Sequence, residues 1–134
     1  MADTLRCSVV TPVESLFEGH ATYVNLPAWD GQLGVMPQTS PFLTRLGTGV
    51  LTIEQDSAAR RFAVDGGFAQ MQEGVLTLLT DGGIAAESID AAKAESELAA
   101  ASAKSVEGAE SVRERQAIER ARKLAFTKVA LARR

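Results

Sequence analysis

Short apolar runs alternate with turn-forming residues along the first 85 positions of the chain. Runs of four to six residues with strand-like composition lie at 5–10, 21–26, 33–36, 50–53, 61–64, 68–71 and 75–80. Glycine-containing turn signals follow five of them, at residues 30–31, 47–49, 65–67, 73–74 and 81–83, and glycine and aspartate are residues that tight turns favour. No stretch between the runs is long enough for a crossover helix, so we expect antiparallel strands in a sandwich or barrel.

The pattern changes near residue 85. Residues 1–85 hold ten of the 11 glycines and all four prolines, whereas residues 86–134 hold 14 alanines and one glycine, Gly108. Alanine has the highest helix propensity, and Gly108 can end a helix. Ser88 is expected to cap a first helix with Asp90 in its first turn, and Ser111 with Glu114 fits a capping box for a second. The predicted fold is therefore mainly β plus α: an N-terminal antiparallel sandwich or barrel at 1–85, then a two-helix antiparallel hairpin at 88–134.

The two predicted helices differ in their apolar faces. The second gathers most of its apolar residues into one arc, with Lys128 inside the arc and Phe126 on the polar side: Ala117, Ile118, Ala121, Leu124, Ala125, Val129, Leu131 and Ala132. The first has only Ile89, Leu98 and Val106 as large apolar residues, and they point in different directions. With so few anchors, we expect the hairpin to be weakly held on the sandwich and mobile.

Charge also divides along the hairpin. Residues 86–110 carry two cations and six anions, giving −4, whereas residues 111–134 carry eight cations and two anions, giving +6. The attraction between two exposed helices is weak because physiological salt screens it. A partner can therefore decide whether the basic helix is folded back or offered to an acidic surface.

Composition excludes several classes of function. The net charge of −3 argues against nucleic-acid binding by the whole surface. One cysteine and one histidine make a metal site improbable, and no apolar run is long enough to span a membrane.

No catalytic group is assigned from the sequence. Cys7 is interpreted as a buried structural thiol, His20 as a solvated turn residue, and Asp65 and Asp81 as turn carboxylates. The remaining glycine motif, 47–49, is better explained by a hairpin turn than by a dinucleotide loop.

One segment is more distinctive than the rest, because it places two glycines and two prolines at fixed spacing. It reads Gly31-Gln32-Leu33-Gly34-Val35-Met36-Pro37-Gln38-Thr39-Ser40-Pro41-Phe42-Leu43-Thr44, and Asp65-Gly66-Gly67-Phe68 follows later. Together these resemble the signature of the epsilon subunit of F-type ATP synthases. The resemblance extends over essentially the whole chain, including the division into sandwich and helical hairpin.

The resemblance implies a non-catalytic rotor subunit of the central stalk. In that family the sandwich joins the gamma subunit to the polar loops of the c ring, and so couples proton-driven rotation to ATP synthesis. By position, six residues are expected to face gamma and the c ring: Asp30, Gly31, Gln32, Gln38, Thr39 and Ser40. Gln38 and Thr39 stand where the family often has Gly-His, so a hydroxyl replaces the frequent histidine and contact there is expected to be insensitive to pH near neutrality.

The resemblance also implies a regulatory role for the hairpin. Family members can extend it toward the catalytic alpha and beta subunits and oppose ATP hydrolysis; the candidate residues for contact with beta are Arg113, Arg115, Arg120, Arg122 and Lys123. A solvated helix face is the alternative explanation for these five cations. Some relatives bind ATP through an [IL]-D-x-x-R-A motif, which 89–94 matches except that Lys93 replaces arginine. With Asp90 and Lys93 as the only candidates, we expect weak ATP binding or none, and no required cofactor.

Two other classes of function stay open at this point. A stand-alone sandwich that binds a carbohydrate or peptide would be expected to show clustered exposed aromatics, and only Trp29 lies in a predicted loop. A small enzyme is disfavoured because no nucleophile is paired with a base. The resemblance favours a subunit held peripherally at the cytoplasmic face of a bacterial inner membrane, not a homo-oligomer, and the absence of a transit peptide agrees with it.

Overall fold

A computed structural model describes residues 3–103 and 111–132. The strands are β1 (Leu5–Val10), β2 (Ser15–Ala21), β3 (Tyr23–Ala28), β4 (Gly31–Val35), β5 (Phe42–Arg45), β6 (Thr48–Gln55), β7 (Ala58–Asp65), β8 (Gly67–Gln72), β9 (Val75–Thr80) and β10 (Gly83–Ala85). A 3₁₀ turn at Ala86–Ser88 leads to helices α1 (Ala91–Ala103) and α2 (Val112–Ala132). Val106, Gly108 and Lys104 lie outside the described residues, so the expected helix stop at Gly108 stays a prediction.

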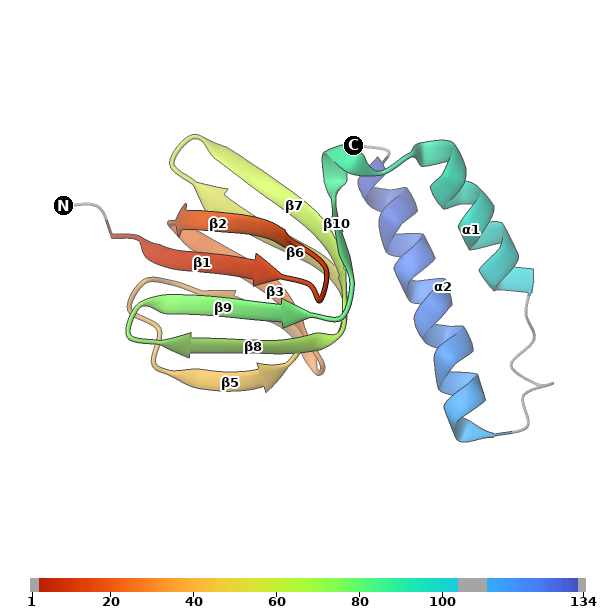
Figure 1. The fold of residues 1–134 in the computed structure, drawn as a ribbon, viewed down its shortest axis with the longest axis horizontal. Coiled ribbons are helices and arrows are strands. Elements are labelled where there is room, and N and C mark those ends of the chain that lie inside the picture. Colours follow the sequence, from red (N-terminus) through yellow and green to blue (C-terminus); the bar gives the residue numbers. More distant parts are fainter. Residues whose placement is uncertain (1–2, 104–110, 133–134) are drawn as a thin grey trace.

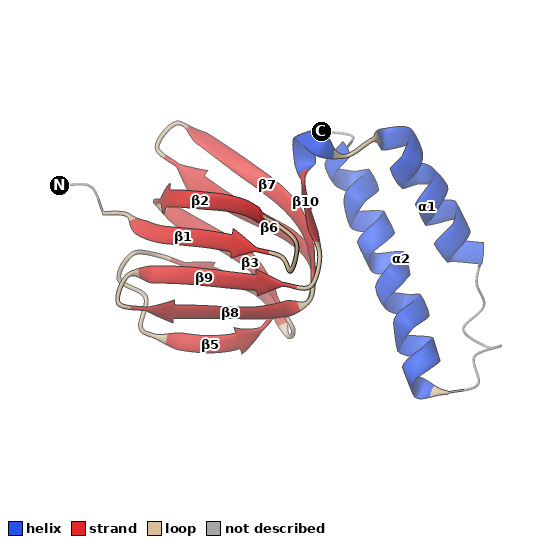
Figure 2. Ribbon diagram, viewed as in Figure 1, coloured by secondary structure: helices blue, strands red, loops and turns tan. Residues whose placement is uncertain are grey.

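The strands form a sandwich of two five-stranded sheets, as Figure 2 shows. One sheet has the order β2-β1-β9-β8-β5 and the other β10-β7-β6-β3-β4. This confirms the predicted sandwich followed by a helical hairpin. One pairing differs from the expectation, because β1 and β9 run parallel while the other named pairs are antiparallel. No crossover helix is needed, since the connection from β1 to β9 consists of the seven strands β2 to β8.

The core lies between the two sheets and accounts for the alternating pattern of the strands. Cys7 is fully buried there, as the sequence predicted, together with Phe62 and Leu78. Burial of each such side chain contributes about 1.5–3 kcal/mol before chain entropy is counted. The sandwich therefore has its own apolar core, which does not include residues of the helices.

Three strands and one helix cap were not predicted correctly. β2, β5 and β10 were missed, and His20 lies exposed within β2 instead of in a turn. The 47–49 motif is not a hairpin turn, because β5 pairs with β8 in one sheet and β6 pairs with β7 in the other.

Asp90, not Ser88, caps α1: its carboxylate Oδ1 accepts a hydrogen bond from the backbone N–H of Lys93 over 3.1 Å. Ser111 caps α2 as predicted, through the backbone N–H of Glu114.

The helices stack outward from the second sheet. α2 contacts β6 and β7, and α1 packs on the far side of α2, as Figure 1 shows. Ala63 is fully buried although its neighbours Phe62 and Val64 point into the sandwich core, so α2 covers the outer face of β7. The buried residues of α2 all lie in its C-terminal half: Ala125, Thr127, Val129 and Leu131.

Candidate functional site

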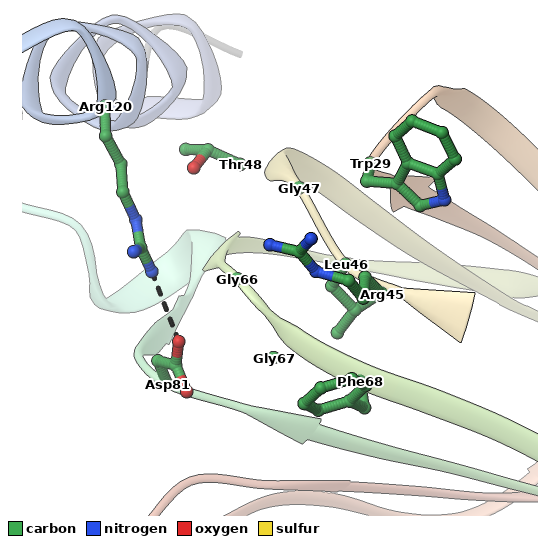
Figure 3. A pocket seen from close by; sticks show the side chains of 10 residues that line it. All are labelled: Trp29, Arg45, Leu46, Gly47, Thr48, Gly66, Gly67, Phe68, Asp81 and Arg120. Carbon is green, nitrogen blue, oxygen red and sulfur yellow. Dashed lines mark hydrogen bonds and ion pairs between the residues drawn. The ribbon is translucent and has the colours of Figure 1, made fainter. Parts of the chain in front are cut away.

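A cluster of charged side chains joins α2 to the turns of the sandwich. Arg120 Nε donates a hydrogen bond to Asp65 Oδ1 over 2.7 Å, and its Nη2 donates to the backbone carbonyl of Asp65 over 3.0 Å. The same Nη2 lies 3.3 Å from Asp81 Oδ2, the contact drawn in Figure 3. The pKa of Arg120 is raised above its ordinary value, chiefly by the hydrogen bond to Asp65. One guanidinium thus bridges two turns of the sandwich.

The sandwich holds the Asp65 carboxylate in position for this contact. The hydroxyl of Thr48 donates to Asp65 Oδ1 over 2.7 Å, which fixes the oxygen that Arg120 uses. Gly66 leaves room for the guanidinium, because a Cβ at that position would lie 2.5 Å from Arg120 Nη2. The Asp-Gly-Gly segment therefore has a role beyond forming a turn, which the sequence did not reveal.

A hollow of about 360 Å³ lies beside this cluster and links it to exposed aromatic side chains. Figure 3 shows Arg120 and Asp81 on one side of it and Trp29, Arg45 and Phe68 on the other. Trp29 is 67% exposed in the turn between β3 and β4, where the sequence placed it in a loop. The hollow is open to solvent and therefore to a partner protein.

An apolar strip crosses the outer face of the first sheet. Leu43, Phe68 and Leu79 are 70%, 52% and 56% exposed on β5, β8 and β9. Phe68 lies opposite both Arg45 and Leu79 in the strand register, and Leu43 projects to the same face as Arg45. Clustered exposed apolar residues mark an interaction surface. The sequence carried a signal for this strip. Phe68 shares the exposed face of β8 with Gln70 and Gln72, so it is an apolar residue on an otherwise polar face.

The six residues expected to face gamma and the c ring lie in two groups. Asp30, Gly31 and Gln32 lie at the start of β4, and all three are exposed. The other three follow the end of β4, so the two groups lie at opposite ends of that strand. Gln38 and Ser40 are exposed, whereas Thr39 is half-buried and its hydroxyl accepts the backbone N–H of Met36 over 2.8 Å. Thr39 therefore shapes the turn.

The five cations expected to contact a beta subunit are also divided. Arg113, Arg115 and Lys123 are exposed. Arg120 is held by the sandwich, and Arg122 Nε donates to the backbone carbonyl of Ala101 in α1 over 3.2 Å. Two of the five cations, Arg120 and Arg122, are therefore engaged in contacts within the chain when the hairpin is docked.

The candidate ATP residues lie at the start of α1. Asp90 is used as the helix cap described above, and the Lys93 side chain is exposed. Within residues 3–103 and 111–132, no group of three or more His, Cys, Asp or Glu side chains could hold a metal ion. Over the same ranges, neither helix is both long and apolar enough to cross a bilayer.

Comparison with known proteins identifies the relatives of this arrangement. Residues 4–86 match the family described as "ATP synthase, Delta/Epsilon chain, beta-sandwich domain". The chain is 41% identical over 98 residues to a protein of Rhodopirellula baltica named ATP synthase epsilon chain, covering 73% of this chain and 77% of that one. Its fold resembles a chain of the Euglena gracilis mitochondrial ATP synthase, with a TM-score of 0.80, 20% identity, and coverage of 97% of this chain and 82% of that one. A chain in the Tetrahymena thermophila mitochondrial central stalk and c ring gives 0.67 at 11% identity, with 95% of each chain covered.

Proposed function

The chain belongs to the ATP synthase epsilon chain family, and on that premise we propose that it is a non-catalytic rotor subunit of the central stalk. It would couple rotation of the c ring to the gamma subunit during ATP synthesis. The observation that carries this proposal is the apolar strip, because a stalk subunit needs a lasting contact with its neighbour. The two solved structures described above, whose fold it shares, come from ATP synthase assemblies.

Two kinds of contact are proposed for the sandwich. Leu43, Phe68 and Leu79 would pack against gamma, since burying exposed apolar area stabilises a permanent interface. The polar group Asp30, Gly31 and Gln32 would meet the polar loops of the c ring. Gln38, Thr39 and Ser40 lie at the other end of β4 and would contact gamma.

Assembly of the complex tests this proposal. The double variant Leu43→Ser/Phe68→Ser is expected to lower copurification of the chain with gamma and c subunits at least tenfold. The matched control is Glu18→Ser/His20→Ser, which alters exposed polar residues of β2 at the opposite edge of the same sheet and should leave copurification unchanged. Equal recovery of both variants would contradict the proposed interface, provided that circular dichroism shows both to be folded.

The hairpin is proposed to restrain ATP hydrolysis. Contact of Arg113, Arg115, Arg120, Arg122 and Lys123 with an acidic surface of a beta subunit would oppose rotation in the hydrolysis direction. In the docked arrangement Arg120 is paired with the sandwich and Arg122 with α1, so all five become available only when the hairpin leaves the sandwich and α2 also separates from α1. The domain at 1–85 would thus carry coupling, and the domain at 88–134 regulation.

ATP binding and location complete the proposal. Asp90 and Lys93 would give at most a weak ATP site, because the Asp90 carboxylate already caps α1. Calorimetry on the free chain measures this directly, and a submicromolar affinity would contradict it.

As part of the complex, the chain would lie peripherally at the cytoplasmic face of a bacterial inner membrane, which agrees with its bacterial relative.

A further inference from the structure

The contacts of α2 with the sandwich differ in kind between its two halves. Buried residues occur only from Ala125 onward among the described residues of α2. In the N-terminal half, Ala117 and Ala121 are exposed and line an open groove together with Arg113 and Leu124. Arg120 is the residue of this half that reaches the turns at Asp65 and Asp81. Docking of the first half of α2 therefore depends on charge more than on apolar burial.

The charged contact has hydrogen-bond geometry but is open to water. Thr48 and Gly66 fix the Asp65 side for a guanidinium, as described above. Arg120 is nevertheless 48% exposed and Asp81 is 66% exposed. A half-exposed ion pair contributes modestly to stability, so ions or a charged partner can compete for it. Buried apolar contacts would not be weakened by competing ions or by a charged partner.

We propose that Arg120, Asp65 and Asp81 form a charge latch that holds the hairpin against the sandwich, and that opening of this latch is the step that releases the hairpin and frees Arg120 for an acidic partner. The latch borders the same hollow as Trp29 and Phe68, so a subunit covering the apolar strip would reach Asp81. Such a subunit would act on the contact between Arg120 and Asp81, either by strengthening it or by displacing Arg120 from Asp81. The consequence of the latch for ATP hydrolysis rests on the proposed function, whereas the latch itself is a property of the free chain.

The latch can be tested by measuring distances in the free chain. Spin labels at Leu43→Cys and Val112→Cys would occupy two exposed sites, one on the sandwich and one at the start of α2. Cys7 is buried and stays unlabelled. Release of the hairpin creates a second distance population, and its share of the signal gives the ratio of released to docked molecules.

Arg120→Ala is expected to raise this ratio roughly fivefold or more. The matched control is Arg115→Ala, which removes the same charge from an exposed position of the same helix. Asp65→Asn should act in the same direction as Arg120→Ala but less strongly, because Arg120 keeps its contact with Asp81, and the double variant should add little to Arg120→Ala. Raising NaCl to about 1 M should raise the ratio for the wild type and leave Arg120→Ala nearly unchanged, because the Debye length falls to about 3 Å.

The latch would be overturned if Arg120→Ala and Arg115→Ala gave the same ratio, or if salt acted equally on the wild type and Arg120→Ala. Failure of the proposed function has a different signature. If Arg120→Ala releases the hairpin of the free chain but leaves ATP hydrolysis by the assembled enzyme unchanged, the latch stands and the regulatory role of the hairpin fails.

Discussion

Gly67 and Leu79 lie so close together that no other residue fits at position 67. A Cβ on Gly67 would lie 2.0 Å from the backbone carbonyl oxygen of Leu79, and the φ of Gly67 is +107°. The second glycine of the Asp-Gly-Gly segment is therefore required where β8 begins beside β9. This close approach also fixes the apolar strip, since Phe68 follows Gly67 and lies opposite Leu79.

Gly67→Ala should destabilise the sandwich by about 3 kcal/mol or more, because backbone strain adds to overpacking. Gly82→Ala is the control, since a Cβ there meets nothing within 4 Å and its φ is not in the left-handed region. It should change stability by less than about 1 kcal/mol. Urea denaturation of the two variants measures the difference, and similar midpoints would refute the close approach.

The buried thiol of Cys7 should make the sandwich less stable at high pH. Burial raises its pKa from 9.0 to about 12. The unfolded chain therefore loses this proton first, and stability falls by up to about 1.4 kcal/mol per pH unit between pH 9 and 12. Below pH 9 the thiol is protonated in both states, so this contribution does not change.

Cys7→Ala separates that effect from the titration of other groups. The stability of the wild type relative to Cys7→Ala should decline from pH 9 upward, as measured by denaturation at several pH values. Parallel pH profiles for the two proteins would show that the thiol is not shielded as described.

Arg60 connects the sandwich core to the segment that leads into α1. Its guanidinium carbon lies 5.1 Å from the Phe62 ring centre, and its Nη2 lies 2.7 Å from Glu87 Oε1. The pKa of Glu87 is lowered, first by a hydrogen bond that its carboxylate accepts from its own backbone N–H and then by the hydrogen bond from Arg60. This favours the folded state above the ordinary glutamate pKa, and the advantage is lost as the pH falls through the lowered pKa.

Arg60→Ala should therefore raise the pKa of Glu87 without restoring it fully to its ordinary value, because the larger cause is retained. An NMR titration of the Glu87 carboxyl group measures this. Arg61→Ala removes a neighbouring charge on the other face of β7 and should have little effect. A Glu87 titration that is identical in the wild type and Arg60→Ala would contradict the contact.

The two halves of the molecule should unfold separately. Val129 is buried in the C-terminal half of α2, so Val129→Ala should weaken hairpin docking by about 1–3 kcal/mol. Phe126→Ala, at an exposed site on the same helix, should cost much less. Hydrogen exchange should show reduced protection in α2 of Val129→Ala with no change in β6 interior amides. An equal loss of protection throughout the chain would indicate a single cooperative unit.

The sequence predicted the architecture because both halves carry strong local patterns. Alternation and turn glycines identified β1 and β9, and the alanine-rich composition identified the hairpin. β2 was missed because Glu18 and His20 make the segment polar and Gly19 interrupts its inner face between the buried Phe17 and Ala21. Ser88 and Asp90 are both good caps, and the extended backbone at Ile89 moved the helix start to the second.

The candidate site was less accessible from the sequence. Arg120 and Asp65 are 55 positions apart, and only the packing of α2 along β7 brings them together. The sequence placed Arg120 on a polar helix face and Asp65 in a turn, and both placements are compatible with a solvated side chain. The expected mobility of the hairpin stays a prediction, as do the contacts with gamma, the c ring and beta.

ATP hydrolysis by the assembled enzyme is the most direct test of the division between a coupling sandwich and a regulatory hairpin. Deletion of residues 88–134 should leave assembly with gamma and the c ring intact, because the sandwich keeps its own core. The hydrolysis rate should rise severalfold, since the basic helix can no longer oppose rotation. An unchanged hydrolysis rate in a fully assembled complex would contradict the account.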